Sequence, residues 1–94
     1  MAVIKNGNGS VGAFAHGPNG HIYHWWNQAG VWTGPEDVTG FLHPQLPILG
    51  EPAAAATGGQ DDVMIVFRAA ADNKLYSCWK QTGAWYGPLQ LPAQ

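Results

Sequence analysis

Short runs of apolar and aromatic residues recur along the chain, and each run ends in residues that favour tight turns. Four runs lie in each half: AVIK, VGAFAHG, HIYHWWN and VWTGPEDV in the first, and AAAAT, VMIVFRAA, KLYSCWK and AWYGPLQL in the second. Their β-branched and aromatic content is typical of strands, and Gly30 and Gly83 can supply the positive φ of a tight turn. Apolar residues nowhere keep a helical spacing. The pattern therefore predicts eight short strands.

The two halves of the chain resemble one another. A shift of 53 residues aligns positions 11–40 with positions 64–93 without a gap, and eight of the 30 aligned pairs are identical. The identities are Phe14/Phe67, Tyr23/Tyr76, Trp26/Trp79, Gln28/Gln81, Gly30/Gly83, Trp32/Trp85, Gly34/Gly87 and Pro35/Pro88. Because proline cannot donate to a strand ladder, the runs that contain Pro35 and Pro88 are predicted to be edge strands. Each copy thus predicts four antiparallel strands, the last at an edge.

A four-stranded unit repeated at this period is typical of a β-propeller, which has roughly four to eight blades. Residues 1–38 are predicted to form the first propeller blade, residues 39–52 a connector and residues 53–94 the second blade. Apolar residues on both faces of a blade need a neighbour on each side. We therefore expect an all-β chain whose ring is completed by oligomerisation, as a six-bladed homotrimer or, alternatively, a tetramer. The alternative architecture is a closed sandwich of the same strands, whose outer faces would be more polar.

Composition and charge argue against several function classes. The 94 residues include six acidic and four basic side chains, too few and too scattered to neutralise a nucleic-acid backbone. No apolar run approaches the roughly 20 residues of a membrane-spanning helix, so we expect no membrane insertion. No signal peptide is visible, which fits a cytoplasmic location or release by a non-classical route. Cys78 is the only cysteine and has no intrachain disulfide partner.

No residue pattern indicates catalysis, a cofactor or a metal. The letters GNGSVG at positions 7–12 match a dinucleotide-binding fingerprint, but no helix follows them, and we interpret them as a hairpin turn. His21 and His24 would point to opposite faces of one strand, and none of the four histidines recurs in the second copy. Glu36 and Asp37 are adjacent and would also face opposite ways, unlike the carboxyl pair of a glycosidase. We expect a protein that is not an enzyme.

Two stretches, AFAHGPNGHIYHWWNQAGVW and IVFRAAADNKLYSCWKQTGAW, resemble a repeat of known type. They are similar to the tectonin-like repeats of bacterial β-propeller lectins of the Photorhabdus lectin type, whose blades follow the pattern VF-R-G-D--LYH-W----GW--W--LGG. Pro35 and Pro88 replace the second tryptophan of that pattern, and members of the family carry a full ring on one chain. The resemblance implies a propeller fold with carbohydrate bound between adjacent blades, without catalysis and without metal.

Aromatic and polar side chains near the strand ends are the candidate ligand-binding residues. Trp32 and Trp85 follow turn glycines at the start of the predicted edge strands, where an exposed aromatic ring can cover the apolar face of a sugar. Polar side chains that would bind sugar hydroxyls surround them: His24, Asn27, Gln28, Glu36, Arg68, Gln81 and Tyr86. Because few charges are present, we expect a neutral ligand.

The hypothesis from the sequence is a multivalent lectin that binds glycans through neutral monosaccharides such as fucose, galactose or an N-acetylhexosamine at the blade junctions. The two copies differ at His24/Ser77 and at Glu36/Leu89, so two classes of site are expected. The alternative function is a protein-interaction or engineered propeller scaffold without sugar binding.

Overall fold

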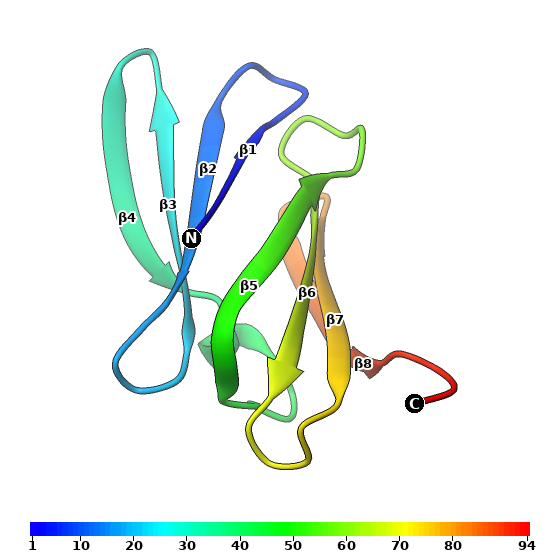
Figure 1. Ribbon diagram of the computed structural model, residues 1–94. Coiled ribbons are helices and arrows are strands. Elements are labelled where there is room, and N and C mark those ends of the chain that lie inside the picture. Colours follow the sequence, from blue (N-terminus) through cyan, green and yellow to red (C-terminus); the bar gives the residue numbers. More distant parts are fainter.

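The computed structural model describes residues 1–94 as two antiparallel sheets of four strands each (Figure 1). The first sheet contains β1 (Ala2–Lys5), β2 (Val11–His16), β3 (Ile22–Gln28) and β4 (Val31–Asp37). The second contains β5 (Ile48–Ala56), β6 (Val63–Ala69), β7 (Leu75–Gln81) and β8 (Ala84–Gln90). Both sheets keep their strands in chain order. The predicted all-β fold with two four-stranded sheets is confirmed, and the proline-containing strands β4 and β8 lie at sheet edges, as expected.

The link between the sheets is shorter than the connector expected over residues 39–52. One short 3-10 helix, η1 (Thr39–Phe41), follows β4, and β5 already begins at Ile48. Ile48 is buried, and its N–H donates to the carbonyl oxygen of Gly20 at 2.7 Å. Strand β5 has an irregular register between Leu49 and Ala53, which accommodates Pro52 at the edge of the sheet. No helix is long and apolar enough to cross a membrane.

The last hairpin of each sheet has the same geometry. His24 pairs with Glu36 in the first sheet, and Ser77 pairs with Leu89 in the second, which preserves the shift of 53 residues. Both hairpins turn through two consecutive residues at positive φ, of which the second is the predicted glycine (Gly30 at 84°, Gly83 at 80°); this is the signature of a type I′ turn.

The second strands of the two sheets are related by a different shift. Phe14 pairs with His24, whereas Phe67 pairs with Tyr76. Since His24 corresponds to residue 77 and not to Tyr76, the β6–β7 connection is one residue longer than the β2–β3 connection. Phe14 therefore corresponds to Val66, and the gapless alignment of Phe14 with Phe67 is wrong. The seven identities in the two hairpins are unaffected.

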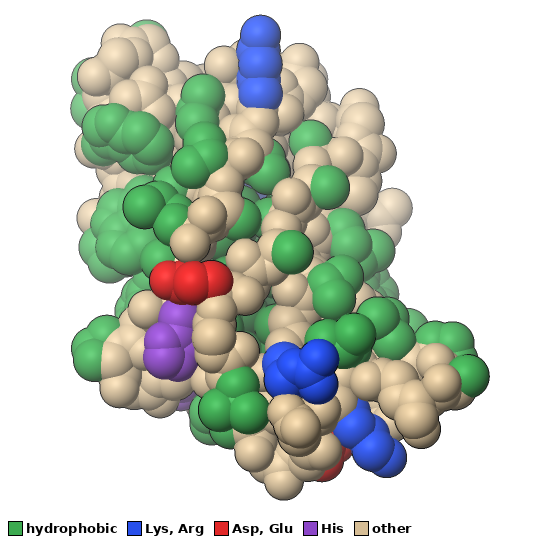
Figure 2. All heavy atoms as spheres, in the orientation of Figure 1, with side chains coloured by type: hydrophobic (Ala, Val, Ile, Leu, Met, Phe, Trp, Pro, Cys, Tyr) green, Lys and Arg blue, Asp and Glu red, His purple; other side chains and the backbone are tan.

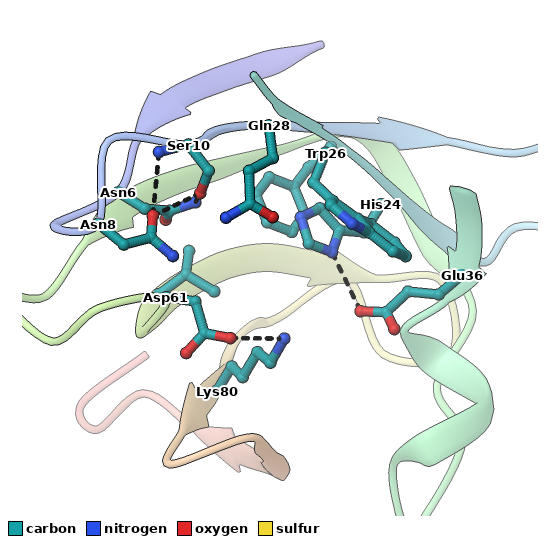
Figure 3. Close-up of a pocket in the computed structure, with 11 residues that line it drawn as sticks. Asn6, Asn8, Ser10, His24, Trp26, Gln28, Glu36, Asp61 and Lys80 are labelled. Carbon is teal, nitrogen blue, oxygen red and sulfur yellow. Dashed lines mark hydrogen bonds and ion pairs between the residues drawn. The ribbon is translucent and has the colours of Figure 1, made fainter. Parts of the chain in front are cut away.

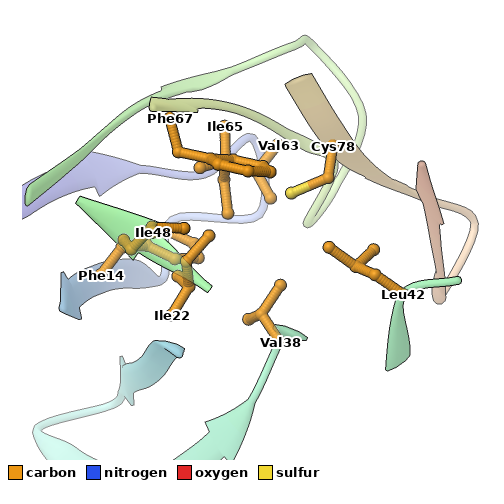
Figure 4. Close-up of a cluster of buried hydrophobic side chains, with 9 residues drawn as sticks. All are labelled: Phe14, Ile22, Val38, Leu42, Ile48, Val63, Ile65, Phe67 and Cys78. Carbon is orange, nitrogen blue, oxygen red and sulfur yellow. The ribbon is translucent and has the colours of Figure 1, made fainter. Parts of the chain in front are cut away.

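Nine buried side chains form the core between the sheets (Figure 4). They come from both sheets and from the link: Phe14, Ile22, Val38, Leu42, Ile48, Val63, Ile65, Phe67 and Cys78. Full burial of one such side chain stabilises the fold by about 1.5–3 kcal/mol. Burial also raises the pKa of the Cys78 thiol to about 12. Cys78 thus occupies an apolar position in the core and is protonated at neutral pH.

Each sheet has one face that packs against the other sheet and one face that points outward. The Phe14 face of the first sheet (Phe14, Ile22, His24 and Trp26) packs against the Ile65 face of the second (Ile65, Phe67, Cys78 and Trp85). On the opposite sides lie the Tyr23 face of the first sheet (Val3, Tyr23, Trp25 and Trp32) and the Trp79 face of the second (Met64, Val66, Trp79, Tyr86 and Leu89). The predicted separation of Ile22 and Trp26 from Tyr23 and Trp25 is confirmed.

Candidate functional site

A pocket of about 250 Å³ lies between the two sheets (Figure 3). Only three of its 11 lining residues are hydrophobic. The first sheet and its β1–β2 loop contribute Asn6, Asn8, Ser10, Phe14, His24, Trp26, Gln28 and Glu36, and the second sheet with its β5–β6 loop contributes Asp61, Val63 and Lys80. The pocket thus joins a mostly polar wall from one sheet to a charged rim from the other.

The β1–β2 loop forms one end of this pocket as a closed polar turn. The Asn6 backbone N–H donates to the Ser10 carbonyl oxygen at 2.8 Å, and the Asn6 side-chain amide donates to Ser10 Oγ at 2.9 Å. The Ser10 hydroxyl in turn donates to Asn8 Oδ1 at 2.6 Å. These bonds confirm the hairpin turn predicted within residues 7–12, and they fix the Asn8 side chain at this end of the pocket.

A β-bulge in β4 aims Glu36 at His24. Trp26 pairs with Thr33, but His24 pairs with Glu36, so β4 contains one extra residue between the two pairs. Gly34 occupies the bulge with φ of 116°, and a Cβ there would lie 2.8 Å from the carbonyl oxygen of His24. Only glycine fits both the backbone angle and the close approach. The Gly-Pro step of the repeat thereby places a carboxylate in the pocket.

Glu36 connects the two sheets. Its Oε1 accepts a hydrogen bond from His24 Nδ1 at 3.0 Å and another from Trp85 Nε1 at 3.2 Å. The His24 bond lowers the pKa of Glu36 below its usual value; the Trp85 bond and the charges of His24 and Lys80 act in the same direction, and burial opposes them. Because a carboxylate only accepts hydrogen bonds, this contact requires a proton on His24 Nδ1. The His24 ring also stacks on Phe14, with centroids 4.3 Å apart.

The other two charges of the pocket neutralise each other. Lys80 Nζ lies 3.2 Å from Asp61 Oδ2 across the mouth of the pocket (Figure 3). The same ammonium is 6.0 Å from the centroid of the Trp85 ring, within the range of a cation–π contact. Each acidic side chain in the pocket therefore has its own partner: Glu36 is hydrogen-bonded to His24, and Asp61 forms an ion pair with Lys80.

Three of the residues expected to bind ligand line this pocket, namely His24, Gln28 and Glu36. Trp85 reaches its edge through the bond to Glu36. Its ring packs edge-on against Phe14, with centroids 6.5 Å apart, so it does not have the exposure expected at the start of an edge strand.

The remaining expected residues lie elsewhere. Asn27 and Trp32 pair with one another on the Tyr23 face, where Trp32 is 55% exposed. Tyr86 stacks on Trp79 on the opposite side of the molecule, with centroids 6.1 Å apart. Arg68 is exposed and donates to the carbonyl oxygen of Asn73 at 2.6 Å.

A second hollow of about 230 Å³ lies on the Trp79 face. It is lined by Thr57, Asp62, Met64, Trp79, Lys80 and Gln81. Gln81, one of the expected ligand-binding residues, is therefore in this hollow and not in the pocket between the sheets.

Several pocket residues were missed by the sequence analysis. Trp26 was not among the expected ligand-binding residues, although it lines the pocket beside His24, with ring centroids 5.3 Å apart. Asn8 was interpreted only as part of a hairpin turn, and Asn6 was not considered. Asp61 and Lys80 come from the other sheet, and their place opposite His24 depends on how the sheets pack. The one available signal was that Trp26 and Gln28 alternate with His24 on one strand and so share its face.

A second histidine forms a separate pair with a carboxylate. His21 Nδ1 lies 2.8 Å from Asp37 Oδ2, on the opposite side of β3 from the His24–Glu36 pair. Glu36 and Asp37 therefore face opposite ways, as the sequence predicted. No group of three His, Cys, Asp or Glu side chains is arranged to hold a metal ion.

Comparison with known proteins finds no matching family model and no similar curated protein.

Proposed function

We propose that the chain is a lectin that binds a neutral monosaccharide in the pocket between the two sheets, without catalysis. The observation that supports this most strongly is the combination of an indole surface with hydrogen-bonding groups in one pocket. Trp26 offers an aromatic face to the apolar side of a sugar ring, while Gln28 carries both a donor and an acceptor and Asn8 offers its amide N–H groups as donors. Hydroxyl groups need such paired donors and acceptors.

Charge supports a neutral ligand. Glu36 is bonded to His24, and Asp61 is paired with Lys80. An anionic sugar would have to separate Lys80 from Asp61 and would also lie close to the Glu36 carboxylate, which repels it. Fucose, galactose or an N-acetylhexosamine requires no such separation.

The size of the pocket favours a single sugar ring. Its 250 Å³ lies below the roughly 300–1,000 Å³ of sites that enclose drug-sized ligands. A shallow site of this kind is expected to bind with Kd near 1 mM, or about −4 kcal/mol.

The proposed lectin is a propeller completed by several chains. Its support is the pair of consecutive four-stranded sheets and the resemblance of the HIYHWWNQAGVW and KLYSCWKQTGAW stretches to propeller lectin repeats. Three chains would give six blades, and four would give eight. Repetition of a weak site around a ring raises avidity on a glycan surface by about 10²–10⁴ without new contacts.

The test is calorimetry of the protein with methyl fucoside, methyl galactoside and N-acetylglucosamine. Binding of one of these sugars is expected, and Gln28→Ala is expected to weaken it at least tenfold because a hydroxyl loses its partner. Arg68→Ala, which changes an exposed side chain outside the pocket, serves as the matched control and leaves binding unchanged.

Two outcomes would overturn the proposal. One is a folded protein that binds no glycan on an array, which would favour a protein-interaction scaffold instead. The other is sugar binding that is insensitive to both Gln28→Ala and Trp26→Ala, which would place the ligand outside this pocket.

A further inference from the structure

The two outward faces of the molecule correspond, strand by strand, to the two faces that pack inside it. The β3–β4 hairpin maps onto β7–β8 by a shift of 53 residues and β2 maps onto β6 by 52. The Trp79 face is then the counterpart of the Phe14 face, and the Tyr23 face is the counterpart of the Ile65 face. The two faces that form the internal interface thus each have a counterpart on the outside of the molecule.

Both outward faces keep the apolar character of their buried counterparts. On the Trp79 face, Tyr86 is 47% and Leu89 59% exposed; on the Tyr23 face, Val3 is 63% and Trp32 55% exposed. Large apolar side chains grouped on the outside of a sheet mark an interaction surface. The face seen in Figure 2 carries one basic side chain at the top and two that lie close together near the bottom, with many apolar side chains between them.

The changes in side-chain size on the two outward faces compensate each other. Val66 stands where the first sheet has the larger Phe14, so the Trp79 face is lower there. On the other outward face, Trp25 stands where the second sheet has the smaller Cys78. One outward face thus loses side-chain volume and the other gains it, and changes of opposite sign are what close packing between the two faces requires.

The polar contact of the internal interface has an apolar counterpart outside. Within the chain, Trp85 Nε1 donates to Glu36 Oε1 at 3.2 Å. The corresponding residues on the outward faces are Trp32 and Leu89. Leu89 offers no acceptor, so the Trp32 indole N–H must keep water or another polar group as its partner when the two faces dock.

The hollow on the Trp79 face is one wall of a second pocket. Trp79 and Gln81 correspond to Trp26 and Gln28 of the first pocket. The Thr57 N–H donates to the Asp62 carbonyl oxygen at 3.2 Å, as the Asn6 N–H does to Ser10 in the first pocket.

The opposite wall of this second pocket is absent from the chain that carries it. In the first pocket, Val63 and Lys80 of the other sheet form this wall. Their counterparts by strand register are Val11 and Asn27 of the first sheet, which lies on the other side of the molecule.

We propose that the Trp79 face docks on the Tyr23 face of a second copy of this chain, in the relative placement that the two sheets have within one chain. Val11 and Asn27 of the second copy then complete the second pocket. The two docking faces differ, so the contact is head-to-tail and repeats until a ring closes. The sugar-binding role of this second pocket rests on the proposed function, whereas the docking does not.

The docking is tested with two exposed positions in β1 and β5, the strands through which the two sheets contact each other within the chain. By strand register, Val3 of the first sheet corresponds to Ala54 of the second, and Ala55 of the second corresponds to Ile4 of the first. Ala54 and Ile4 both pack against the core within the chain. Val3→Asp and Ala55→Asp should therefore leave the chain folded, because both side chains are exposed in a single chain, but each would bury an unpaired charge on docking. Val31→Asp, at a position that is 64% exposed in the β3–β4 hairpin, is the matched control.

Light scattering at micromolar concentration is expected to give three or four times the 10.0 kDa of one chain for the unaltered protein and for Val31→Asp. Val3→Asp and Ala55→Asp each give single chains, with association weakened at least a hundredfold. An equimolar mixture of the two variants gives a dimer and nothing larger, since one intact Trp79 face meets one intact Tyr23 face.

Three results would overturn the docking: an unaltered protein that stays a single chain, a variant that assembles by itself, or a mixture that forms no dimer. Calorimetry with methyl fucoside, methyl galactoside and N-acetylglucosamine then separates this inference from the proposed function. The assembled protein should bind twice as much sugar per chain as the single-chain variants. A dimer from the mixture with no sugar binding at any site would leave the docking intact and refute the lectin function.

Discussion

The Phe14 face of the first sheet and the Trp79 face of the second have the same strand pairing but different side chains. The first carries His24 and Glu36, and it is covered by the other sheet within the chain. The second carries Ser77 and Leu89 at the same positions, and nothing in the chain covers it. The two copies thus share their backbone pairing, but the hydrogen bonds of Glu36 to His24 and Trp85 occur in the first copy only. The sheet that carries Trp85 belongs to the same chain, so this partner is present without any assembly.

The largest difference between the two faces is expected in the core. Phe14 is fully buried and stacks on His24, so Phe14→Ala is expected to reduce the free energy of unfolding by about 3–5 kcal/mol. Val66→Ala, the matching change on the Trp79 face, is expected to cost about 1 kcal/mol. Urea unfolding followed by tryptophan fluorescence, at one protein concentration for all variants, measures both. Equal losses would mean that the two faces are equally covered in solution.

A second pair of variants should act equally in both copies. Gly34 and Gly87 both have positive φ, and a Cβ would lie 2.8 Å and 2.9 Å from the carbonyl oxygens of His24 and Ser77. Gly34→Ala and Gly87→Ala are each expected to cost about 1–3 kcal/mol because of backbone strain and crowding. Gly30→Ala is the control with positive φ but open space around the Cβ, and it should cost less. Unequal losses at Gly34 and Gly87 would contradict the shared hairpin geometry.

A smaller effect distinguishes the two copies by pH. The pKa of Glu36 is lowered in the folded protein, so its contribution to stability is present above the ordinary value of 4.5 and is lost as the pH falls through the lowered pKa. Glu36→Gln is expected to cost about 1 kcal/mol at pH 7 and progressively less in acid. Leu89→Gln, at the same position of the second copy, should show no such pH dependence. Parallel stability curves for the unaltered protein and Glu36→Gln would refute this role of the carboxylate.

The smallest effect concerns the ion pair at the pocket mouth. Lys80→Met removes a partly exposed pair with Asp61 and is expected to cost about 0.2–1 kcal/mol, a loss that should disappear at 1 M salt. Asn27→Met, at the corresponding position of the first sheet, should change stability less and independently of salt. Thermal unfolding at low and high salt measures both variants. A loss at Lys80 that persists at high salt would show that its side chain contributes by packing and not by charge.

The local structure could be predicted from the sequence better than the site could. The hairpin turns at Gly30 and Gly83 and the edge position of Pro35 and Pro88 follow from backbone restrictions that act within a few residues, and the structure confirms them. The register of β6 does not follow in this way. One extra residue in the β6–β7 connection moves Phe67 to the other side of its sheet relative to Phe14, and the identity of the two residues hides this shift.

The sequence predicted only those pocket residues that come from the β3–β4 hairpin. His24, Gln28 and Glu36 come from a single hairpin, and all three were expected to bind ligand. Asp61 and Lys80 enter the pocket from the second sheet, at a place decided by packing between sheets. Sequence spacing carries no information on such long-range contacts, which explains why both were missed.

The buried thiol of Cys78 has a practical consequence for chemical labelling. It is the only sulfhydryl group of the chain, it is fully buried, and its pKa of about 12 leaves almost no thiolate at pH 7. Maleimide and iodoacetamide react with the thiolate, so the native protein should resist both. A cysteine introduced at any exposed position would then be the sole conjugation site, and a dye or spin label could be attached without first removing a native residue.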